Sequence, residues 1–130
     1  MRTIRVSLPV RSLQVSKAFF AELGFTFSPE PSGGQTACML IDRNIVVTLV
    51  AEDRFRDRAG GDVDTAGAAA RFVISLSAGS EQEVDQTVVK AITAGGKPWP
   101  IIEDSHVYSG SFQDLDGHVW QLTCPGHRHP

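Results

Sequence analysis

Gln121 is the residue whose type and position most suggest chemistry, and it stands in the stretch FQDLDGHVWQL. Asp116-Gly117 favours a tight two-residue turn, and polarity alternates on both sides of it, so the stretch is predicted to be a β-hairpin. The alternation places Gln121 on the polar face of the second strand, with Trp120 on the other face. An amide in that position can bind a ligand, coordinate a metal through its carbonyl oxygen, or serve only as part of the sheet.

Arg5 and Arg71 are candidate anion-binding residues. Arg5 and Ser7 share the polar face of the alternating stretch TIRVSLPV, and Arg71 opens RFVISLS, where a similar pattern restarts. A guanidinium matches a carboxylate or a phosphate with two parallel hydrogen bonds. The plainer interpretation is that these arginines pair with acidic residues such as Glu103 or Asp114, or lie in solvent.

Aromatic and imidazole side chains in the second half supply the remaining candidates. If EDSHVYSGSF is extended, His106 and Tyr108 share one face and can both contact a ligand, with His106 as a weak candidate for a general acid or base. Trp99, between two prolines, suits an aromatic wall near the rim of a site. For each of these an ordinary surface role is the alternative. His118, beside the predicted turn, is expected to be solvated.

The composition is that of a globular protein without a nucleic-acid or membrane partner. The chain has 130 residues, 42% hydrophobic and 21% charged, which suits one domain or two small halves that share a core. Its net charge is −3, with no basic stripe for a phosphate backbone and no apolar run near the roughly 18 residues of a membrane helix. Cys38 and Cys124 do not make a disulfide framework, so a cytoplasmic location with free thiols is expected.

The elements that must position these residues are predicted to occur twice. Residues 3–10 and 13–23 have the patterns of a strand and a helix, and strands follow in FTF, TACMLID and IVVTLVA. The same order returns in RFVISLS, SEQEVDQTVVKAITAGG, KPWPIIE, VYSGSFQDL and HVWQLTC. A charged and then Gly/Ala-rich segment separates the halves. We therefore expect a single domain, 1–130, with module one at about 1–51, a linker at 52–69, module two at about 70–124 and a tail at 125–130.

The two halves can be aligned with each other. Superposing the two hairpin turns places Thr48 on Gln121, and counting back from the ends of the first strands places Arg5 on Arg71. Each half is too small to bury one face of its sheet alone. We expect an α+β fold in which two paired βαβββ modules form a curved, partly closed sheet round a cleft, with the helices outside.

Two stretches carry a resemblance to a known group. LPVRSLQVSKAFFAELGF is similar to the opening strand and helix of the vicinal oxygen chelate superfamily, and SFQDLDGHVWQL resembles its closing hairpin. The superfamily includes glyoxalase I, extradiol dioxygenases and bleomycin-resistance proteins. The chain looks most similar to small bacterial glyoxalase-like proteins that are labelled predicted lactoylglutathione lyases. The resemblance extends over nearly the whole chain and implies the same paired modules.

The resemblance also implies where a metal would be held. In the metal-dependent members one divalent ion acts as a Lewis acid, and its ligands, typically His, Gln or Glu, come from the first and last strands of each module. Those positions fall on Arg5, Thr48, Arg71 and Gln121. An arginine has no lone pair to give, threonine is a weak neutral donor, and one glutamine does not hold a divalent ion. We therefore expect no cofactor, with a divalent metal as the alternative.

The expected function is the binding of a small polar or anionic molecule in the cleft between the modules, without the usual metal and with a homodimer as the assembly. The alternative is a metal-dependent lyase, isomerase or dioxygenase of the glyoxalase type with atypical ligands, or a metal-free enzyme that uses His106 or the arginines. A third possibility is an interaction protein with a vestigial cleft. The ligand-binding candidates are Arg5, Ser7, Thr48, Arg71, Trp99, His106, Tyr108 and Gln121.

Overall fold

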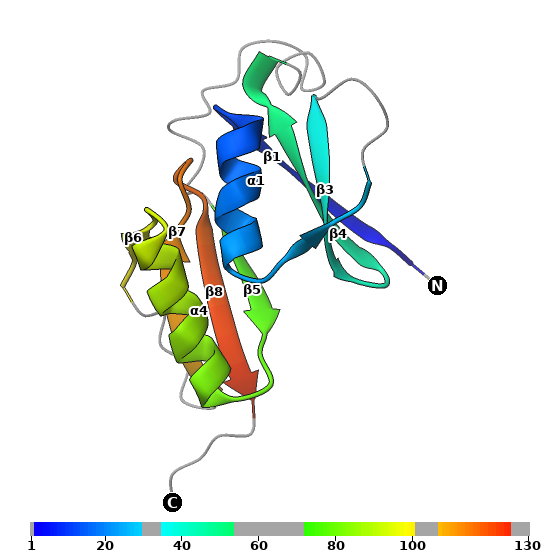
Figure 1. Cartoon of the computed structure of the whole chain (residues 1–130). Helices are drawn as coiled ribbons and strands as arrows, with labels where there is room; N and C mark the ends of the chain where they lie inside the picture. The colour runs from blue at the N-terminus through cyan, green and yellow to red at the C-terminus, as the bar shows by residue number, and fades with distance from the viewer. Residues whose placement is uncertain (1, 30–34, 54–71, 101–106, 126–130) are drawn as a thin grey trace, which may run out of the picture. The chain divides into compact units, whose positions relative to one another are not determined.

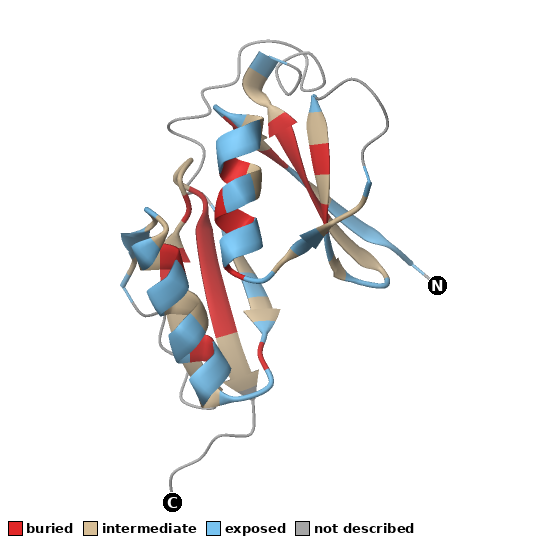
Figure 2. Ribbon diagram, in the orientation of Figure 1, coloured by how far each residue is buried: buried red, intermediate tan, exposed pale blue. Residues whose placement is uncertain are grey.

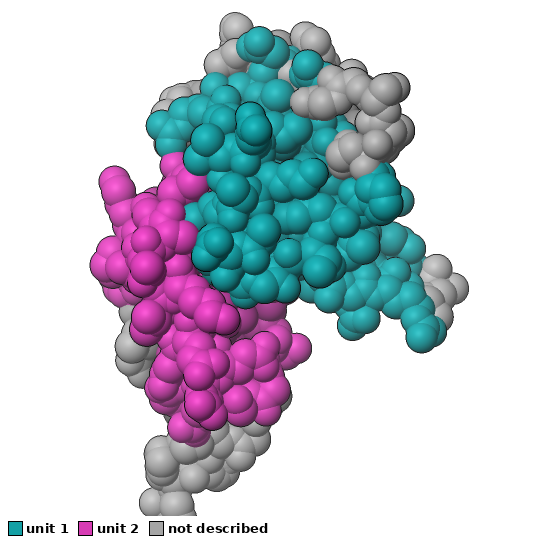
Figure 3. Space-filling view, in the orientation of Figure 1, with its two compact units in different colours: residues 1–68 teal, residues 69–130 magenta. Residues whose placement is uncertain are grey.

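The chain divides into two compact units, residues 1–68 and 69–130 (Figure 3). The structure is a computed structural model that describes residues 2–29, 35–53, 72–100 and 107–125 (Figure 1). Within these residues each unit contains one helix and a four-stranded mixed sheet that does not close into a barrel. This is the α+β arrangement of two modules with outer helices that the sequence predicts. Most of the predicted linker lies outside the described residues, as do Arg71 and His106.

Unit 1 follows the order strand, helix and three strands. Its sheet has the order β1-β4-β3-β2, in which β1 runs parallel to β4 and the other neighbours are antiparallel. The elements are β1 (Ile4–Val10), α1 (Leu13–Glu22), β2 (Thr26–Phe27), β3 (Thr36–Asp42) and β4 (Ile45–Ala51). The predicted hairpin is confirmed, because β3 and β4 join through residues 43–44.

Helix α1 begins and ends where the sequence predicts. The Ser12 side chain is the N-cap and accepts a hydrogen bond from the backbone N–H of Val15 at 3.2 Å. Gly24 follows the helix with a φ of +100°, a conformation that glycine adopts without strain. The helix lies against β3 and β4. The core of unit 1 is apolar and consists of Leu8, Val10, Phe19, Phe20, Leu23, Ala37, Met39, Val47, Leu49 and Val50.

Unit 2 repeats this plan with the sheet order β5-β8-β7-β6. Strand β5 is parallel to β8, and the other neighbours are antiparallel. The elements are β5 (Val73–Ser77), α4 (Glu81–Thr93), β6 (Lys97–Pro98), β7 (Val107–Gln113) and β8 (Val119–Pro125). Strand β8 is the most deeply covered of them, buried from residue 119 to residue 122 (Figure 2). In the described part of the chain, no helix is long and apolar enough to cross a membrane.

Helix α4 covers one face of its sheet. Its N-cap Ser80 accepts from the backbone N–H of Glu83 at 3.1 Å, and the Glu83 carboxylate accepts from the backbone N–H of Gly79 at 2.7 Å. The helix packs on β7 and β8. A Cβ atom added to Gly110 of β7 would lie 2.9 Å from Val88 and 3.0 Å from Val84, so α4 approaches this strand closely. The residues of β7 in phase with Gly110 therefore face the helix.

The two sheets have corresponding registers. Ser7 pairs with Thr48 between the parallel strands of unit 1, and Ser75 pairs with Gln121 between those of unit 2. Ser7 and Ser75 each lie five residues before the N-cap serine of the following helix, so their strand partners Thr48 and Gln121 occupy corresponding positions. Their predicted correspondence is therefore confirmed.

The alignment of the first strands needs a correction of two residues. Since Ser75 is the counterpart of Ser7, the counterpart of Arg5 is Val73 and not Arg71. The sequence alignment fails because it equates the last prominent apolar residues of two strands that end at different points. The helix caps give a better reference, since in each unit the N-cap serine follows the counterpart serine by five residues.

Candidate functional site

A row of polar side chains crosses the sheet of unit 2. Ser75, Gln121 and Ser111, named row 2, lie in register on β5, β8 and β7. The Ser75 hydroxyl donates to the amide oxygen Oε1 of Gln121 at 2.6 Å. Gln121 is 7% exposed and Ser111 is 4% exposed. Within the described residues, the buried Oγ of Ser111 has no hydrogen-bond partner.

The face that carries row 2 is the face away from α4. Strand alternation places Gln121 opposite to Trp120, and Ser111 opposite to Gly110, which faces the helix. In the described part of the sheet, no charged side chain from β5, β7 or β8 lies on this face. Its further members on these strands are Val73, Ser77, Val107, Ser109, Gln113, Val119 and Thr123, and the edge strand β6 adds the exposed Lys97, which pairs with Gln113. Along β5, β8 and β7 the face therefore offers hydroxyl and amide groups between small apolar residues, with one lysine at the β6 edge.

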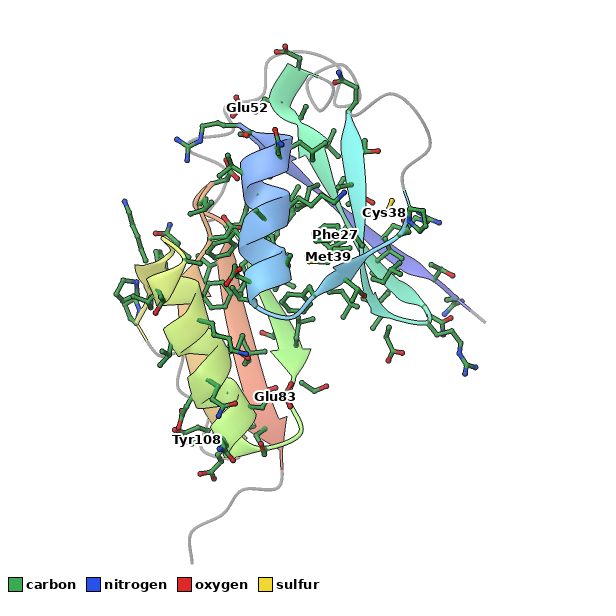
Figure 4. All side chains as sticks on the ribbon, in the orientation of Figure 1. Phe27, Cys38, Met39, Glu52, Glu83 and Tyr108 are labelled. Atoms are coloured by element: carbon green, nitrogen blue, oxygen red, sulfur yellow. The ribbon has the colours of Figure 1, made fainter. Side chains whose placement is uncertain are left out.

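A corresponding row crosses the sheet of unit 1. Ser7, Thr48 and Cys38, named row 1, lie in register on β1, β4 and β3. The Sγ atom of Cys38 and the Oγ1 atom of Thr48 are 3.8 Å apart. Alternation sends the neighbouring Met39 into the core, and Figure 4 labels both side chains. Arg5 is exposed and lies on the face of row 1, two positions before Ser7.

Asp114 fixes the hairpin that carries Gln121 and Ser111. Its Oδ1 atom accepts from the backbone N–H groups of Asp116 at 2.9 Å and His118 at 3.0 Å, and its Oδ2 atom accepts from the indole N–H of Trp120 at 2.9 Å. Burial raises the pKa of the Asp114 carboxyl, against the opposing effects of His118 and of the hydrogen bond from Trp120. The carboxylate thus ties β8 to the turn next to Gln121.

The turn itself differs from the sequence prediction. The Asp114 N–H donates to the His118 carbonyl at 2.9 Å, and the Gly117 N–H donates to the Asp114 carbonyl at 3.2 Å, so the loop consists of residues 115–117. Gly117 has a φ of +90°. This is the three-residue hairpin loop with a left-handed glycine, and not a two-residue turn. It draws His118 inward, to an exposed fraction of 3%, which corrects the expectation that this histidine is solvated.

No family model and no curated protein matches the chain. Solved structures, in contrast, do resemble it. The hypothetical protein SA1046 from S. aureus is 27% identical with a TM-score of 0.80, over 95% of this chain and 94% of that one. A glyoxalase/bleomycin resistance protein/dioxygenase family enzyme from Burkholderia phytofirmans is 15% identical with a TM-score of 0.76, over 96% and 99% of the two chains. The chain has the glyoxalase/bleomycin resistance fold.

A third neighbour is a resistance protein. The fosfomycin resistance protein FosX from Listeria monocytogenes is 16% identical with a TM-score of 0.70, over 100% of this chain and 95% of that one. These neighbours have the fold that the resemblance of the two sequence stretches implies.

On this glyoxalase/bleomycin resistance fold, the described residues at the implied ligand positions do not suit a divalent metal. The Arg5 guanidinium has no lone pair to give, and the Thr48 hydroxyl lies against Cys38. The atom of Gln121 that would coordinate a metal is Oε1, which accepts from Ser75. Across the described ranges, no group of three or more His, Cys, Asp or Glu side chains is placed to hold a metal ion.

Tyr108 lies on the opposite face of its sheet from row 2. It is in phase with Gly110 on β7 and therefore faces α4, where its hydroxyl donates to Oδ1 of Asp85 at 2.6 Å (labelled in Figure 4). That hydrogen bond, with smaller effects of burial and of the acidic charges of Asp85 and Glu81, raises the pKa of Tyr108. Tyr108 therefore does not share a face with Gln121. Trp99 is half-buried directly after β6.

Ser75, Ser111 and Cys38 are members of the rows that the candidate residues of the sequence analysis leave out. The sequence contains a signal for the two serines. Serine occurs at alternate positions in VISLS, residues 73–77, and in VYSGSFQ, residues 107–113. Such alternation on two strands predicts a hydroxyl-rich face, provided that the strands belong to one sheet. No comparable signal singles out Cys38.

Proposed function

We propose that the chain binds a small polar or anionic molecule on the polar faces of its sheets, without the divalent metal of the metal-dependent superfamily members. The observation that carries the proposal is the hydrogen bond from Ser75 to Oε1 of Gln121 at 2.6 Å. It engages the atom through which Gln121 would coordinate a metal. A residue at a ligand position thereby becomes part of a hydrogen-bonding surface.

The two rows supply groups that orient small ligands. Binding sites in proteins combine apolar walls with a few well-placed polar groups, and row 1 and row 2 have this character. Arg5, exposed on the face of row 1, adds a donor that suits a carboxylate, phosphate or phosphonate. The cleft between the modules and the roles of Arg71 and His106 stay predictions.

Thermal-shift measurements with small anions test the proposal. Phosphate and (1S,2S)-dihydroxypropylphosphonic acid should raise the melting temperature, and Arg5→Ala should reduce the increase because it removes the guanidinium beside row 1. Arg43→Ala is the matched control, since Arg43 is an exposed arginine in the turn after β3. Equal responses of Arg5→Ala and the native protein to every anion would show that Arg5 does not bind them.

The alternative is a metal-dependent lyase, isomerase or dioxygenase of the glyoxalase type with atypical ligands. One observation favours it, because a mutant of FosX has been solved with Mn(II) and 1S,2S-dihydroxypropylphosphonic acid. Elemental analysis of the purified chain distinguishes the two functions. Stoichiometric Mn, Fe, Ni or Zn that is lost in Gln121→Ala would establish the enzyme-like site. Metal content near zero, with anion binding retained, supports the metal-free binder.

A further inference from the structure

The Ser111 hydroxyl is a buried polar group whose role the fold does not explain. Its Oγ atom has no hydrogen-bond partner within the described residues, although Ser111 is only 4% exposed. Backbone hydrogen bonds between β7 and β8 form the ladder around it and do not use the side chain. Folded proteins rarely leave a buried hydroxyl unsatisfied, because the loss of its water contacts is unfavourable. A group that binds to it would remove this penalty.

Ser75 fixes the orientation of the Gln121 side-chain amide in row 2. Its hydroxyl donates to Oε1 of Gln121 at 2.6 Å, which holds the amide of the central strand in one rotation. Gln121 is the direct cross-strand neighbour of Ser111. Row 2 is therefore a preorganised amide beside an unsatisfied hydroxyl, and preorganisation of this kind favours binding because few side chains must be ordered.

The three strands that carry row 2 place no charged side chain on its face, and the register adds one charge from the edge strand β6, where the exposed Lys97 pairs with Gln113. Every described residue of β5, β7 and β8 on this face is apolar, a hydroxyl or an amide. Row 1 differs, because Arg5 lies beside it, whereas the corrected register places Val73 at the corresponding position of unit 2. A charged ligand group placed against row 2 would lose its hydration without gaining an opposite charge from the described residues of β5, β7 and β8.

We propose that row 2 recognises an uncharged polar group of the ligand, a hydroxyl, carbonyl or carboxamide, through the Ser111 hydroxyl, with Ser75 as the residue that positions Gln121 beside it. This inference rests on the proposed function and specifies it. Row 2 recognises a neutral group, and Arg5 beside row 1 is considered separately as a candidate for anions.

Acetamide and acetate are suitable probes because they have nearly the same shape and differ in charge. In two-dimensional NMR spectra of the ¹⁵N-labelled chain, acetamide should shift the side-chain amide of Gln121 and the backbone amide of Ser111. Acetate should leave both resonances in place. If acetate shifts them more than acetamide does, row 2 binds anions and the inference is wrong, while the proposed function stands. If neither probe, nor phosphate, affects the polar face of either sheet, both proposals fail.

Ser111→Ala separates binding from folding. Removal of a buried, unsatisfied hydroxyl should leave the melting temperature of the free protein equal or higher, and it should weaken acetamide binding by about tenfold. Ser77→Ala is the matched control, because Ser77 is an exposed serine on the same face of strand β5. Unchanged acetamide affinity in Ser111→Ala would overturn the role of Ser111. A markedly lower melting temperature would show that the hydroxyl is structural.

Discussion

Asp114 shows how one residue determines the geometry of the candidate site. Its carboxylate accepts N–H groups from the loop and from Trp120, whose neighbour in the chain is Gln121. Sequence alternation predicts the face of Gln121, because the period of a strand determines it. The same alternation cannot predict the burial of His118. That burial depends on the loop length, and the loop length depends on hydrogen bonds that Asp114 makes with residues up to six positions away.

Asp114→Asn should lower the free energy of unfolding by about 1–3 kcal/mol, because an amide cannot accept from every N–H that the two carboxylate oxygens now satisfy. Urea denaturation followed by circular dichroism measures the change. Trp120→Phe removes the indole donor, so the double variant should be less destabilised than the sum of the two single variants. Additive effects would mean that the carboxylate and the indole do not stabilise the fold together.

The difference in unfolding free energy between the native protein and Asp114→Asn should depend on pH in a definite direction. Burial raises the pKa of Asp114 above 3.8, so between that value and the folded pKa the native state binds more protons than the unfolded state. The stability that this group contributes is fully present below 3.8 and is lost as the pH rises through the folded pKa. The stability advantage of the native protein over Asp114→Asn should therefore decrease from acidic to neutral pH. If the stability advantage of the native protein increases over this pH interval, the hydrogen bonds to the carboxylate outweigh burial in setting the pKa of Asp114.

The helices and strands follow closely from local sequence signals. The correspondence between the first strands of the two units does not. Serine N-caps and C-terminal glycines mark both helices, and the sequence superposition of the two hairpins correctly identifies Thr48 and Gln121 as counterparts. The first strands have no turn to fix their register relative to the last strands, because parallel strands are joined through distant parts of the chain. The apparent match of Arg5 with Arg71 arises from that lack of a local constraint. The cap serines correct it because they are tied to the helix starts.

Gly110→Ala tests the packing of α4 on β7. The added Cβ would lie 2.9 Å from Val88 and 3.0 Å from Val84, both apolar side chains of the helix, so the helix or the strand must shift. We expect a loss of about 1–3 kcal/mol in the free energy of unfolding, the usual effect of overpacking. Gly79→Ala is the control, because its Cβ would meet only the flexible end of Glu83, at 3.3 Å. Equal stability of the two variants would mean that α4 does not pack tightly on β7.

At the scale of the whole molecule, the sequence predicts the repeat because the hydrophobic period changes in the same order in each half. It predicts less about the site, since row 2 joins residues separated by 46 positions in the chain. Ser75 and Ser111 become recognisable only when β5, β8 and β7 are known to be neighbours. The expectation that no metal is bound needs less structural information, because it depends on the residue types at the implied ligand positions and not on which strands are neighbours.

Edge strands lead to the prediction of a homodimer. In the described sheets β1 and β5 are edge strands, and apolar side chains are exposed where they begin, with Ile4 58% and Val73 40% exposed. Exposed edges with apolar side chains favour association with a second copy, which in most soluble oligomers is symmetric. Sedimentation equilibrium should therefore give about twice the chain mass of 14.1 kDa.

Ile4→Lys should weaken the dimer, because it places a charge at this edge, whereas Val15→Lys changes an exposed apolar residue of α1 and provides the control. A mass of one chain at every concentration would rule out the dimer, and an equal effect of the two lysines would exclude the β1 edge from the interface.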